Sequence, residues 1–467
     1  MERYIYDALY GPVYFPDYVW KIMFCPELQR LREVRLCNIN SLCLTGGANT
    51  NRYEHSLGAA YLATKCIESS RLRIDERTAR RIVLAALLHD VGSAAFGHSV
   101  QYVLDSQGYR HESLFEMVSS GAQRAVKSPK QTALFDSSNG VNDSTGQKYD
   151  YRHALVEPIY FGLPPRLSSL IPDDELKTIS QMVQGEGPYH ALINGTVDLD
   201  NIDNVFRLAY HMGLVRSGQA PLKLASSITI EKENIVIDDG AIDSLREWYE
   251  IRKTLYRYLL LNPDEFSAKC MLQEALEIAQ GQSTFSFYWQ DVDYQLLERL
   301  SQCSDETSAI ISRLMIGDLY GCIGIYSCPD INFNAQLANP LSRRQMELNL
   351  GTRIRAVGAG ALKSAVVGLH PILDVNKTRR PVNAISTSGK SVEIGEPIRR
   401  VLVGVFFKNI HLGMATIDRG NLGKLGVLQI VSNWLEEITK CSEIEELEPY
   451  AEAKEARTRI ASSHSGR

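Results

Sequence analysis

Several segments within the first 318 residues repeat apolar side chains at intervals of three and four positions, the period of an amphipathic helix. The segment 75–92 also begins with acidic residues and ends at Gly92, as the helix dipole and helix termination favour. The helical pattern covers residues 26–39, 53–70, 75–92, 173–183, 199–214 and 241–261. We therefore expect a mainly α protein in which residues 1–318 form one large helical domain.

The pattern changes in the remaining segments. Residues 226–240 alternate apolar and polar positions around a charged turn, which predicts a β-hairpin on the helical body. Gly-rich pieces and a β-branched run indicate a smaller α+β C-terminal region over 319–444, closed by an amphipathic helix at 422–440. We expect the charged tail, 445–467, to be frayed and the polar stretch 136–149 to be a flexible loop.

The composition is that of a soluble globular protein. Of the 467 residues, 44% are hydrophobic and 22% charged, and the net charge is −5. This balance argues against non-specific coating of nucleic acid and leaves small anionic ligands as candidate partners. No segment stays uncharged long enough to span a bilayer and the N-terminus lacks a signal-peptide pattern, so we expect no membrane association and a cytoplasmic location. The nine cysteines include no CxxC pair, which argues against a zinc ribbon or a disulfide framework.

The candidate chemistry starts in the stretch "AALLHDVGSAAFGH", where His89 and Asp90 end an apolar helix. Burying an unpaired carboxylate is costly, so buried charges generally pair or bind a metal. His55 begins another predicted helix that could pack beside this pair. Two imidazoles with a carboxylate suit a first-row transition metal better than calcium. A further ligand would come from a distant helix, for which the spacing does not choose among Asp198, Asp200 and Asp203.

A purely structural interpretation of these residues is also open. Both histidines could be hydrogen-bonded core side chains, and the aspartates could cap a helix. Asp198 is a good N-cap candidate for the helix that follows it. Taken one residue at a time, the sequence favours this interpretation.

Motifs in order along the chain resemble those of a known family. They are a Gln-Arg-Leu helix and a "NRYEHSLG" segment within residues 25–63, then "ALLHDVGSAAFGH" at 86–98, and the Asp-x-Asp of 198–200. The set resembles the HD-domain deoxynucleotide triphosphohydrolases, which include the mammalian SAM and HD domain dNTP hydrolase and bacterial dGTPases. The resemblance covers roughly residues 20–260. It implies a helical HD domain that hydrolyses dNTPs at the α-phosphate to nucleoside and triphosphate.

The resemblance also implies roles for single residues. The implied metal ligands are His55, His89, Asp90 and Asp200. The implied substrate and catalytic residues are Arg52 at a phosphate, His98 at the phosphates, His111 as the general acid with Glu112 beside it, Arg252 at the nucleotide and Asn204 at a sugar-reading position. We expect iron or manganese as the metal, with nickel, zinc and magnesium still open, and magnesium also accompanying the nucleotide.

Regulation and partners follow from the same resemblance. Family members are typically oligomeric and often bind an activating nucleotide at a subunit interface. The N-terminal segment 4–15, "YIYDALYGPVYF", resembles the part that builds such a site. We therefore expect a homo-oligomer with allosteric activation, and the breadth of the family suggests a role in antiviral defence.

Several positions depart from the family pattern. Ser93 and Ala95 replace a histidine and a proline of the HD run, and Gln101 replaces an aspartate that backs the catalytic histidine. At the sugar-reading positions the chain has Leu36, Asn204 and Leu208. Losing groups that hydrogen-bond a hydroxyl removes the basis for selecting it. Two alternatives therefore stay open: a phosphodiesterase or phosphatase acting on another nucleotide, and a nucleotide-binding sensor with little turnover.

Overall fold

The computed structural model describes the larger part of the chain. The described residues are 3–37, 49–69, 71–97, 100, 162–163, 166–231, 234–282, 285, 287–329, 331–358, 360–373, 381–395, 400–409, 422–423 and 425–447. The predicted loop at 136–149 and the predicted site residues His98, His111 and Glu112 lie outside these ranges, as does Gln101.

The first part of the chain is a helical unit, as the sequence pattern predicts. Its helices are α1 (Asp17–Ile22), α2 (Pro26–Gln29), α3 (Arg52–Glu68), α4 (Glu76–Leu88), α7 (Leu167–Leu170), α8 (Asp173–Val183), α9 (Leu199–His211), α10 (Gln219–Ser226) and α11 (Ile242–Leu261), with 3-10 turns η1 (Arg30–Glu33), η3 (His190–Leu192) and η4 (Asp239–Ala241). Local capping starts three of these helices: the side chains of Asn51, Asp75 and Asp198 accept backbone N–H bonds at the first turns of α3, α4 and α9. The predicted N-cap at Asp198 is thus confirmed. None of the described helices is long and apolar enough to cross a membrane.

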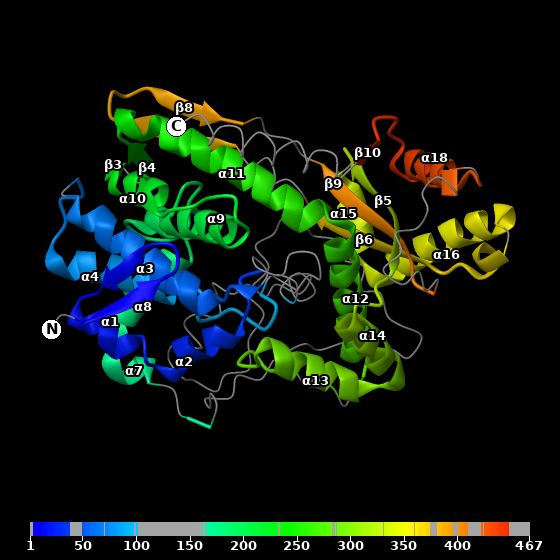
Figure 1. The fold of residues 1–467 in the computed structure, drawn as a ribbon, viewed down its shortest axis with the longest axis horizontal. Helices are drawn as coiled ribbons and strands as arrows, with labels where there is room; N and C mark the ends of the chain where they lie inside the picture. Colours follow the sequence, from blue (N-terminus) through cyan, green and yellow to red (C-terminus); the bar gives the residue numbers. More distant parts are fainter. Residues whose placement is uncertain are drawn as a thin grey trace.

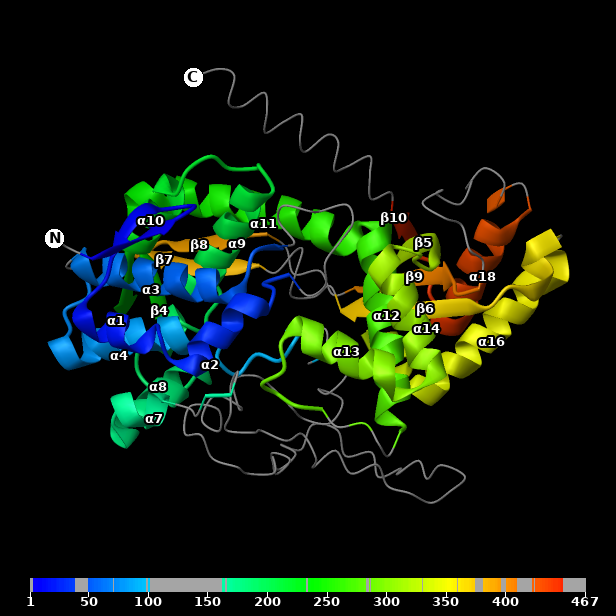
Figure 2. The same ribbon diagram turned by 60° about the horizontal axis from the view of Figure 1, so that its bottom comes forward.

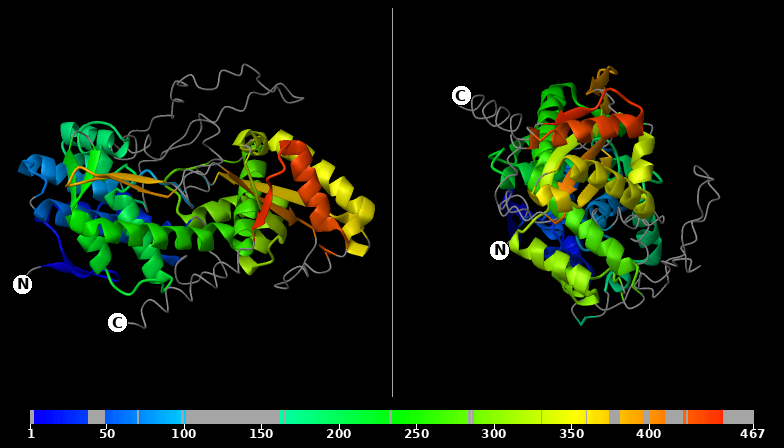
Figure 3. Two further views of the ribbon diagram at one scale, coloured as in Figure 1. Left: turned by 90° about the horizontal axis from the view of Figure 1, so that it is seen from above. Right: turned by 90° about the vertical axis from the view of Figure 1, so that its right-hand side faces the viewer.

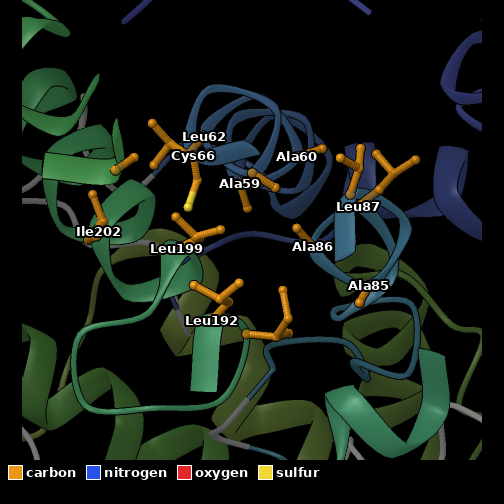
Figure 4. Close-up of a cluster of buried hydrophobic side chains, with 14 of the residues drawn as sticks. Ala59, Ala60, Leu62, Cys66, Ala85, Ala86, Leu87, Leu192, Leu199 and Ile202 are labelled. Carbon is orange, nitrogen blue, oxygen red and sulfur yellow. The ribbon is translucent and has the colours of Figure 1, made fainter. Parts of the chain in front are cut away.

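Helices α3, α4 and α9 form the core of this unit (Figure 4). Small side chains line the contact: Ala59 and Ala60 on α3 and Ala85 and Ala86 on α4 are almost completely buried. They let the two helices approach closely, while Leu199 of α9 fills the space beside them. The packing brings the start of α3, the end of α4 and the start of α9 to one place.

The C-terminal unit combines helices with a sheet, so the chain is mainly α with a smaller α+β region, as predicted. The boundary differs from the predicted residue 319, because the helices between residues 263 and 316 share a hydrophobic cluster with Ile325 and Phe406 of the sheet. Its helices are α12 (Pro263–Gln280), α13 (Asp293–Cys303), α14 (Asp305–Ile316), α15 (Ile331–Ala338), α16 (Pro340–Val357) and α18 (Val427–Thr439), with the 3-10 turn η5 (Gly360–Ser364). Its antiparallel strands, in the order β10-β5-β9-β6, are β10 (Glu445–Leu447), β5 (Gly321–Cys328), β9 (Val401–Phe407) and β6 (Val367–Leu373). Figure 3 shows the helical unit at one end of the molecule and this unit at the other.

The central strand β9 is buried on both faces, which explains its unbroken apolar sequence. Leu402 and Phe406 belong to a cluster with α12, whereas Val401, Val403 and Val405 pack in a second cluster with α16 and α18. The start of the predicted tail differs from our expectation. Residues Glu445–Leu447 are not frayed but pair with β5, because the edge of that strand offers backbone groups that need partners.

Two further strand groups lie on the helical unit. An N-terminal hairpin joins β1 (Tyr4–Asp7) to β2 (Gly11–Tyr14). The second group is a sheet in the order β3-β4-β7-β8, made of β3 (Ile228–Glu231), β4 (Asn234–Ile237), β7 (Val382–Ser386) and β8 (Ser391–Ile394). The predicted hairpin at 226–240 is confirmed by the β3–β4 pair. The sequence pattern did not reveal that β7 pairs in parallel with β4, so that a hairpin from the C-terminal region lies on the helical unit (Figure 1).

Candidate metal centre

Three helix ends converge on one small cluster of side chains. His55 comes from the first turn of α3, His89 caps α4 and Asp200 lies in the first turn of α9. Nε2 of His55 is 3.2 Å from Nε2 of His89 and 2.9 Å from Oδ1 of Asp200, and Nε2 of His89 is 3.5 Å from the same oxygen. Among the described residues these three form a group able to hold a metal ion.

The hydrogen bonds of the two histidines determine which ring nitrogen faces the cluster. Nδ1 of His55 is 2.8 Å from Oδ2 of Asp203, and Nδ1 of His89 is 2.8 Å from the carbonyl oxygen of Ala86. A carbonyl only accepts, and so does an ionised carboxylate, so each Nδ1 carries the proton. In the neutral rings both Nε2 atoms then direct lone pairs toward each other. Only a cation placed between them, either a metal ion or an added proton, relieves that repulsion.

Asp90 adds a fourth acceptor to the cluster. Its Oδ1 accepts from Nη1 of Arg52 at 2.6 Å and from the hydroxyl of Ser93 at 2.8 Å. Its Oδ2 is buried and has no hydrogen-bond partner among the described residues. That oxygen is 3.6 Å from Nε2 of His89 and 4.0 Å from Nε2 of His55. An orphaned buried carboxylate oxygen beside two imidazole lone pairs fits a bound cation, because such an oxygen is otherwise costly to bury.

The separations also suit a divalent transition metal. Ligands bonded at about 2.0 to 2.2 Å lie roughly 3 Å or more apart around the ion. The distances that join the two Nε2 atoms to each other and to the carboxylate oxygens of Asp90 and Asp200 run from 2.9 Å, between His55 and Asp200, to 4.0 Å, between His55 and Asp90. The two imidazoles and the Asp200 carboxylate therefore fit a metal ion, and the Asp90 carboxylate lies beside both imidazoles.

The electrostatics of the cluster favour positive charge at its centre. Burial alone lowers the pKa of His89, but the charges of Asp90 and Asp200 outweigh burial and raise that pKa to about 10. Burial would raise the pKa of the Asp90 carboxyl, yet Arg52 and His89 hold it far below its usual range. Burial would also raise the pKa of the Asp200 carboxyl, but His89 and His55 hold it well below its usual range. Both carboxylates are thus ionised at neutral pH, and the site attracts a cation.

Arg52 lies beside the cluster with hydrogen-bonding capacity to spare. It is buried, one nitrogen is bonded to Asp90, and its Nε has no hydrogen-bond partner among the described residues. Gly97 packs against the guanidinium: a Cβ at that position would stand 2.2 Å from Nη2 of Arg52. A buried guanidinium with an unused donor next to a metal site suits a phosphate oxygen.

The loop that follows Asp90 is anchored from elsewhere in the chain, by residues that our sequence analysis did not identify. Nη2 of Arg30 donates to the carbonyls of Val91 and Ser93 at 3.2 and 2.5 Å. Oδ1 of Asp293, at the start of α13, accepts from the backbone N–H of Phe96 at 2.7 Å, and Phe96 has a left-handed φ of 54°. The "QRLR" motif was a signal for Arg30, but its bonds to this loop span about sixty residues and cannot be seen in the sequence.

The remaining predicted residues are placed as follows. Asn204 lies one turn beyond Asp200 on α9, and its Oδ1 is buried without a hydrogen-bond partner among the described residues. Arg252 is buried in α11 with its guanidinium 5.8 Å from the ring of Trp248 and 5.2 Å from that of Tyr256. Asp203, one of the three candidate ligands on this helix, instead lies behind His55 and bonds its Nδ1. The pair Asp203 and Arg207 at helical spacing was the signal available for that role.

Comparisons with known proteins agree with this geometry. The HD domain family matches residues 52–138. A protein of Dictyostelium discoideum named deoxynucleoside triphosphate triphosphohydrolase SAMHD1 homolog is 23% identical over 394 residues, 78% of this chain and 66% of the relative. The SAMHD1 protein of Xenopus laevis is 29% identical over 281 residues, 54% of this chain and 41% of the relative.

A solved structure supports the same fold. The structure of a phosphohydrolase from Bacteroides thetaiotaomicron aligns with a TM-score of 0.58 and 16% identity over 87% of this chain and 99% of its own. The curated relatives are longer, and the matches span about two thirds of the Dictyostelium protein and two fifths of the Xenopus protein. Residues 52–138 of the chain thus match the HD domain family, and over longer stretches the chain resembles the deoxynucleoside triphosphate triphosphohydrolases.

Proposed function

We propose that this protein is a metal-dependent nucleotide phosphohydrolase that cleaves dNTPs to deoxynucleoside and triphosphate. The observation that carries the proposal is the convergence of four acceptor atoms with the orphaned Oδ2 of Asp90 among them. The similarity to named dNTP triphosphohydrolases supports the choice of substrate.

The residues of the site would hold the metal ion and leave one side open to the substrate. His55, His89, Asp90 and Asp200 would hold the ion. When bound, a divalent metal supplies Lewis-acid chemistry and makes water a stronger nucleophile at neutral pH. The Asp200 side chain is 31% exposed, whereas Asp90 and both histidines are buried, so substrate would approach from the side of Asp200.

Arg52 would hold a phosphate oxygen. Its bond to Asp90 fixes one edge of the guanidinium and leaves other donors for the substrate. A donor already in place at the developing negative charge stabilises the transition state without reorganisation. Arg52 thus links the ligand Asp90 to the phosphate chain.

Proton transfer would come from the segment outside the described residues. His111 is proposed to protonate the leaving oxygen, with Glu112 beside it and His98 at the phosphates. An imidazole titrates near neutral pH and suits this step. These three roles, and that of Arg252 at the nucleotide, rest on the motif resemblance.

Sugar selection is expected to be weak. Leu36 and Leu208 are buried in the hydrophobic core of the helical unit and offer no hydrogen bond to a hydroxyl. The buried Oδ1 of Asn204 could accept one hydrogen bond from a sugar hydroxyl, but a single acceptor gives little discrimination. Because discrimination needs polar groups that are left unpaired by the wrong substrate, we expect broad use of nucleotides.

Other parts of the interpretation stay predictions. Iron or manganese is the metal we propose for a set of two histidines and two aspartates, with magnesium accompanying the nucleotide. A homo-oligomer activated by nucleotide at a subunit interface, a role in antiviral defence and a cytoplasmic location are proposed from the motif resemblance alone.

One observation favours a second candidate, a nucleotide sensor with little turnover. Ser93 occupies the place of a family histidine, and its hydroxyl donates to Oδ1 of Asp90. It is therefore engaged with a proposed metal ligand and does not replace the missing histidine at the phosphates. A phosphatase or phosphodiesterase activity on another nucleotide would use the same metal site.

Product analysis tests these proposals. Purified protein with manganese is incubated with each dNTP and NTP, singly and in mixtures, and the products are separated by ion exchange. We expect nucleoside plus triphosphate, with loss of at least about a hundredfold in rate for Asp90→Ala, because the variant lacks a ligand and leaves Arg52 unpaired. Inorganic phosphate or nucleoside monophosphate would instead indicate the phosphatase or phosphodiesterase alternative. Nucleotide binding without any product would indicate the sensor.

A further inference from the structure

The orientation of His55 depends on a buried network that reaches the N-terminal hairpin. We propose that Tyr10 and Asp7 are positioning residues for the metal centre, acting on His55 through Asp203 and Arg207. The proposal rests on the metal site of the proposed function but not on the identity of the substrate.

Asp203 is the first link behind His55. It is completely buried, and its Oδ2 accepts from Nδ1 of His55 at 2.8 Å and from Nε of Arg207 at 2.9 Å. Its Oδ1 accepts from the Tyr10 hydroxyl at 2.8 Å and from Nη2 of Arg207 at 3.0 Å. With both oxygens bonded from two sides, the carboxylate has one orientation and holds the His55 ring in the tautomer whose Nε2 faces the metal site.

Arg207 is the second link and is also completely buried. Besides Asp203, it contacts Oδ2 of Asp7 at 3.0 Å and Oε1 of Glu54 at 2.6 Å. Its guanidinium lies 5.5 Å from the centre of the Tyr10 ring. A buried guanidinium needs such partners, because one left unpaired would be strongly destabilising.

Gly58 gives independent evidence that α3 accommodates this network. A Cβ at position 58 would stand 2.0 Å from Oδ1 of Asp203 and 2.2 Å from Nη2 of Arg207. Glycine within a helix is less favourable than alanine, so its presence in the middle of α3 has a packing reason. Helix α3, which carries His55, therefore approaches Asp203 and Arg207 most closely at Gly58, its one glycine.

The hairpin contributes through its turn. Oδ1 of Asp7 accepts from the backbone N–H groups of Leu9 and Tyr10 at 2.8 and 2.9 Å. These bonds shape the turn between β1 and β2 and present the Tyr10 ring to Asp203. Figure 2 shows the hairpin in dark blue beside the helices of the unit. Asp7 thus fixes Tyr10 through one oxygen and Arg207 through the other.

Removing the Tyr10 hydroxyl leaves Oδ1 of Asp203 with one partner fewer. The carboxylate gains freedom to turn, and His55 can place a proton on Nε2, which cannot then bind a metal. Loss of a residue that orients a metal ligand commonly costs about 10- to 100-fold in affinity. Tyr10 acts one link further away and contributes one neutral hydrogen bond, so we expect a smaller loss of about three- to tenfold.

The test is metal binding in the absence of nucleotide. Metal-free protein of residues 1–467 is titrated with Co²⁺ against a chromophoric chelator, and the visible spectrum of the bound ion is recorded. We compare Tyr10→Phe with Tyr61→Phe, since the Tyr61 ring lies 5.4 Å from that of Tyr10 but contributes no hydroxyl to Asp203. We expect Tyr10→Phe to raise the Kd for Co²⁺ about three- to tenfold and to shift the visible absorption bands of the bound ion. Tyr61→Phe should leave the Kd and the spectrum unchanged.

A Tyr10→Phe protein with the wild-type Kd and spectrum would overturn the proposal. Asp7→Asn is a second variant, expected to weaken Co²⁺ binding at least as much, and urea unfolding confirms that each variant is folded. A wild-type protein that binds no Co²⁺ would overturn both this proposal and the proposed function. If instead Tyr10→Phe weakens Co²⁺ binding but no nucleotide is hydrolysed, the positioning role stands and the hydrolase proposal falls.

Discussion

At the scale of single residues, Gly97 controls where the Arg52 guanidinium can lie. Its φ of +47° favours glycine, and a Cβ there would meet Nη2 of Arg52 at 2.2 Å. We expect Gly97→Ala to displace the guanidinium and so weaken the phosphate binding that we propose for Arg52. The expected result is a rise in KM for dNTP of about tenfold, because one charge-assisted hydrogen bond contributes about 1.5 kcal/mol or more.

Gly187→Ala is the matched control for this prediction. Gly187 has a φ of +75°, and a Cβ there would meet nothing within 4 Å. The Gly187→Ala substitution places an alanine at a positive φ, which costs a similar backbone strain of about 1 to 2 kcal/mol, and it does not contact Arg52. We expect the control to lower the urea midpoint while KM stays at its wild-type value. Equal KM values for both alanine variants would show that Gly97 does not position Arg52.

How far the site follows from sequence differs among its residues. The Arg-Tyr-Glu-His and His-Asp motifs point to His55, His89 and Asp90 through the family resemblance, whereas taken one residue at a time they favour hydrogen-bonded core histidines. Asp203 could not be separated from Asp200 by spacing, because which of two nearby carboxylates reaches a metal depends on the rotation of α9 in its packed position. Tyr10 lies in the segment 4–15 that the resemblance linked to a nucleotide site, but no local pattern predicts its contact with Asp203, which spans 193 residues.

At the scale of elements, strand β6 carries a buried histidine that makes the α+β unit sensitive to acid. His370 is 9% exposed and its ring packs 5.4 Å from that of Phe266. Burial, with the charges of Arg343 and Lys269, lowers its pKa from 6.5 to about 3. Between those values the unfolded chain binds the proton and the folded chain does not, so stability falls as the pH falls below 6.5.

The size of this effect can be measured. At pH 5 the expected loss is on the order of 2 kcal/mol relative to pH 8, from about 1.4 kcal/mol for each pH unit below 6.5. We propose urea unfolding of the wild type and of His370→Gln at both pH values. Between pH 8 and pH 5, the free energy of unfolding of His370→Gln should fall by about 2 kcal/mol less than that of the wild type. An identical loss in both proteins would show that His370 does not cause the dependence.

The sequence predicted helices and strands well where apolar residues repeated with one period along most of the element. The helices around His55 and His89 and the β3–β4 hairpin follow from periodicity, since their own side chains determine them. Strands β7 and β10 were not anticipated. Each is short, and what makes it a strand is the edge of β4 or β5 that it joins, which lies far away in the sequence.

At the scale of the whole molecule, the two units share more than the α11–α12 connection. Parallel pairing of β7 with β4 attaches a C-terminal hairpin to the helical unit, and Val382 of β7 lies in the core of that unit. A second cluster joins Phe96, from the loop after Asp90, to Phe406 of β9. The packing around the loop that follows Asp90 therefore includes the C-terminal unit, an arrangement that no local pattern in the sequence predicts.

These connections predict that the protein unfolds in one cooperative step. Val382 and Val401 are both buried, but Val382 packs in the core of the helical unit and Val401 in that of the α+β unit. Each valine-to-alanine change removes buried methyl groups and should cost about 2 kcal/mol. If the units unfold together, both variants lower the same midpoint, measured by far-ultraviolet circular dichroism and by tryptophan fluorescence. Two transitions in the wild type, with Val382→Ala shifting only one of them, would show that the β4–β7 pairing does not couple the units.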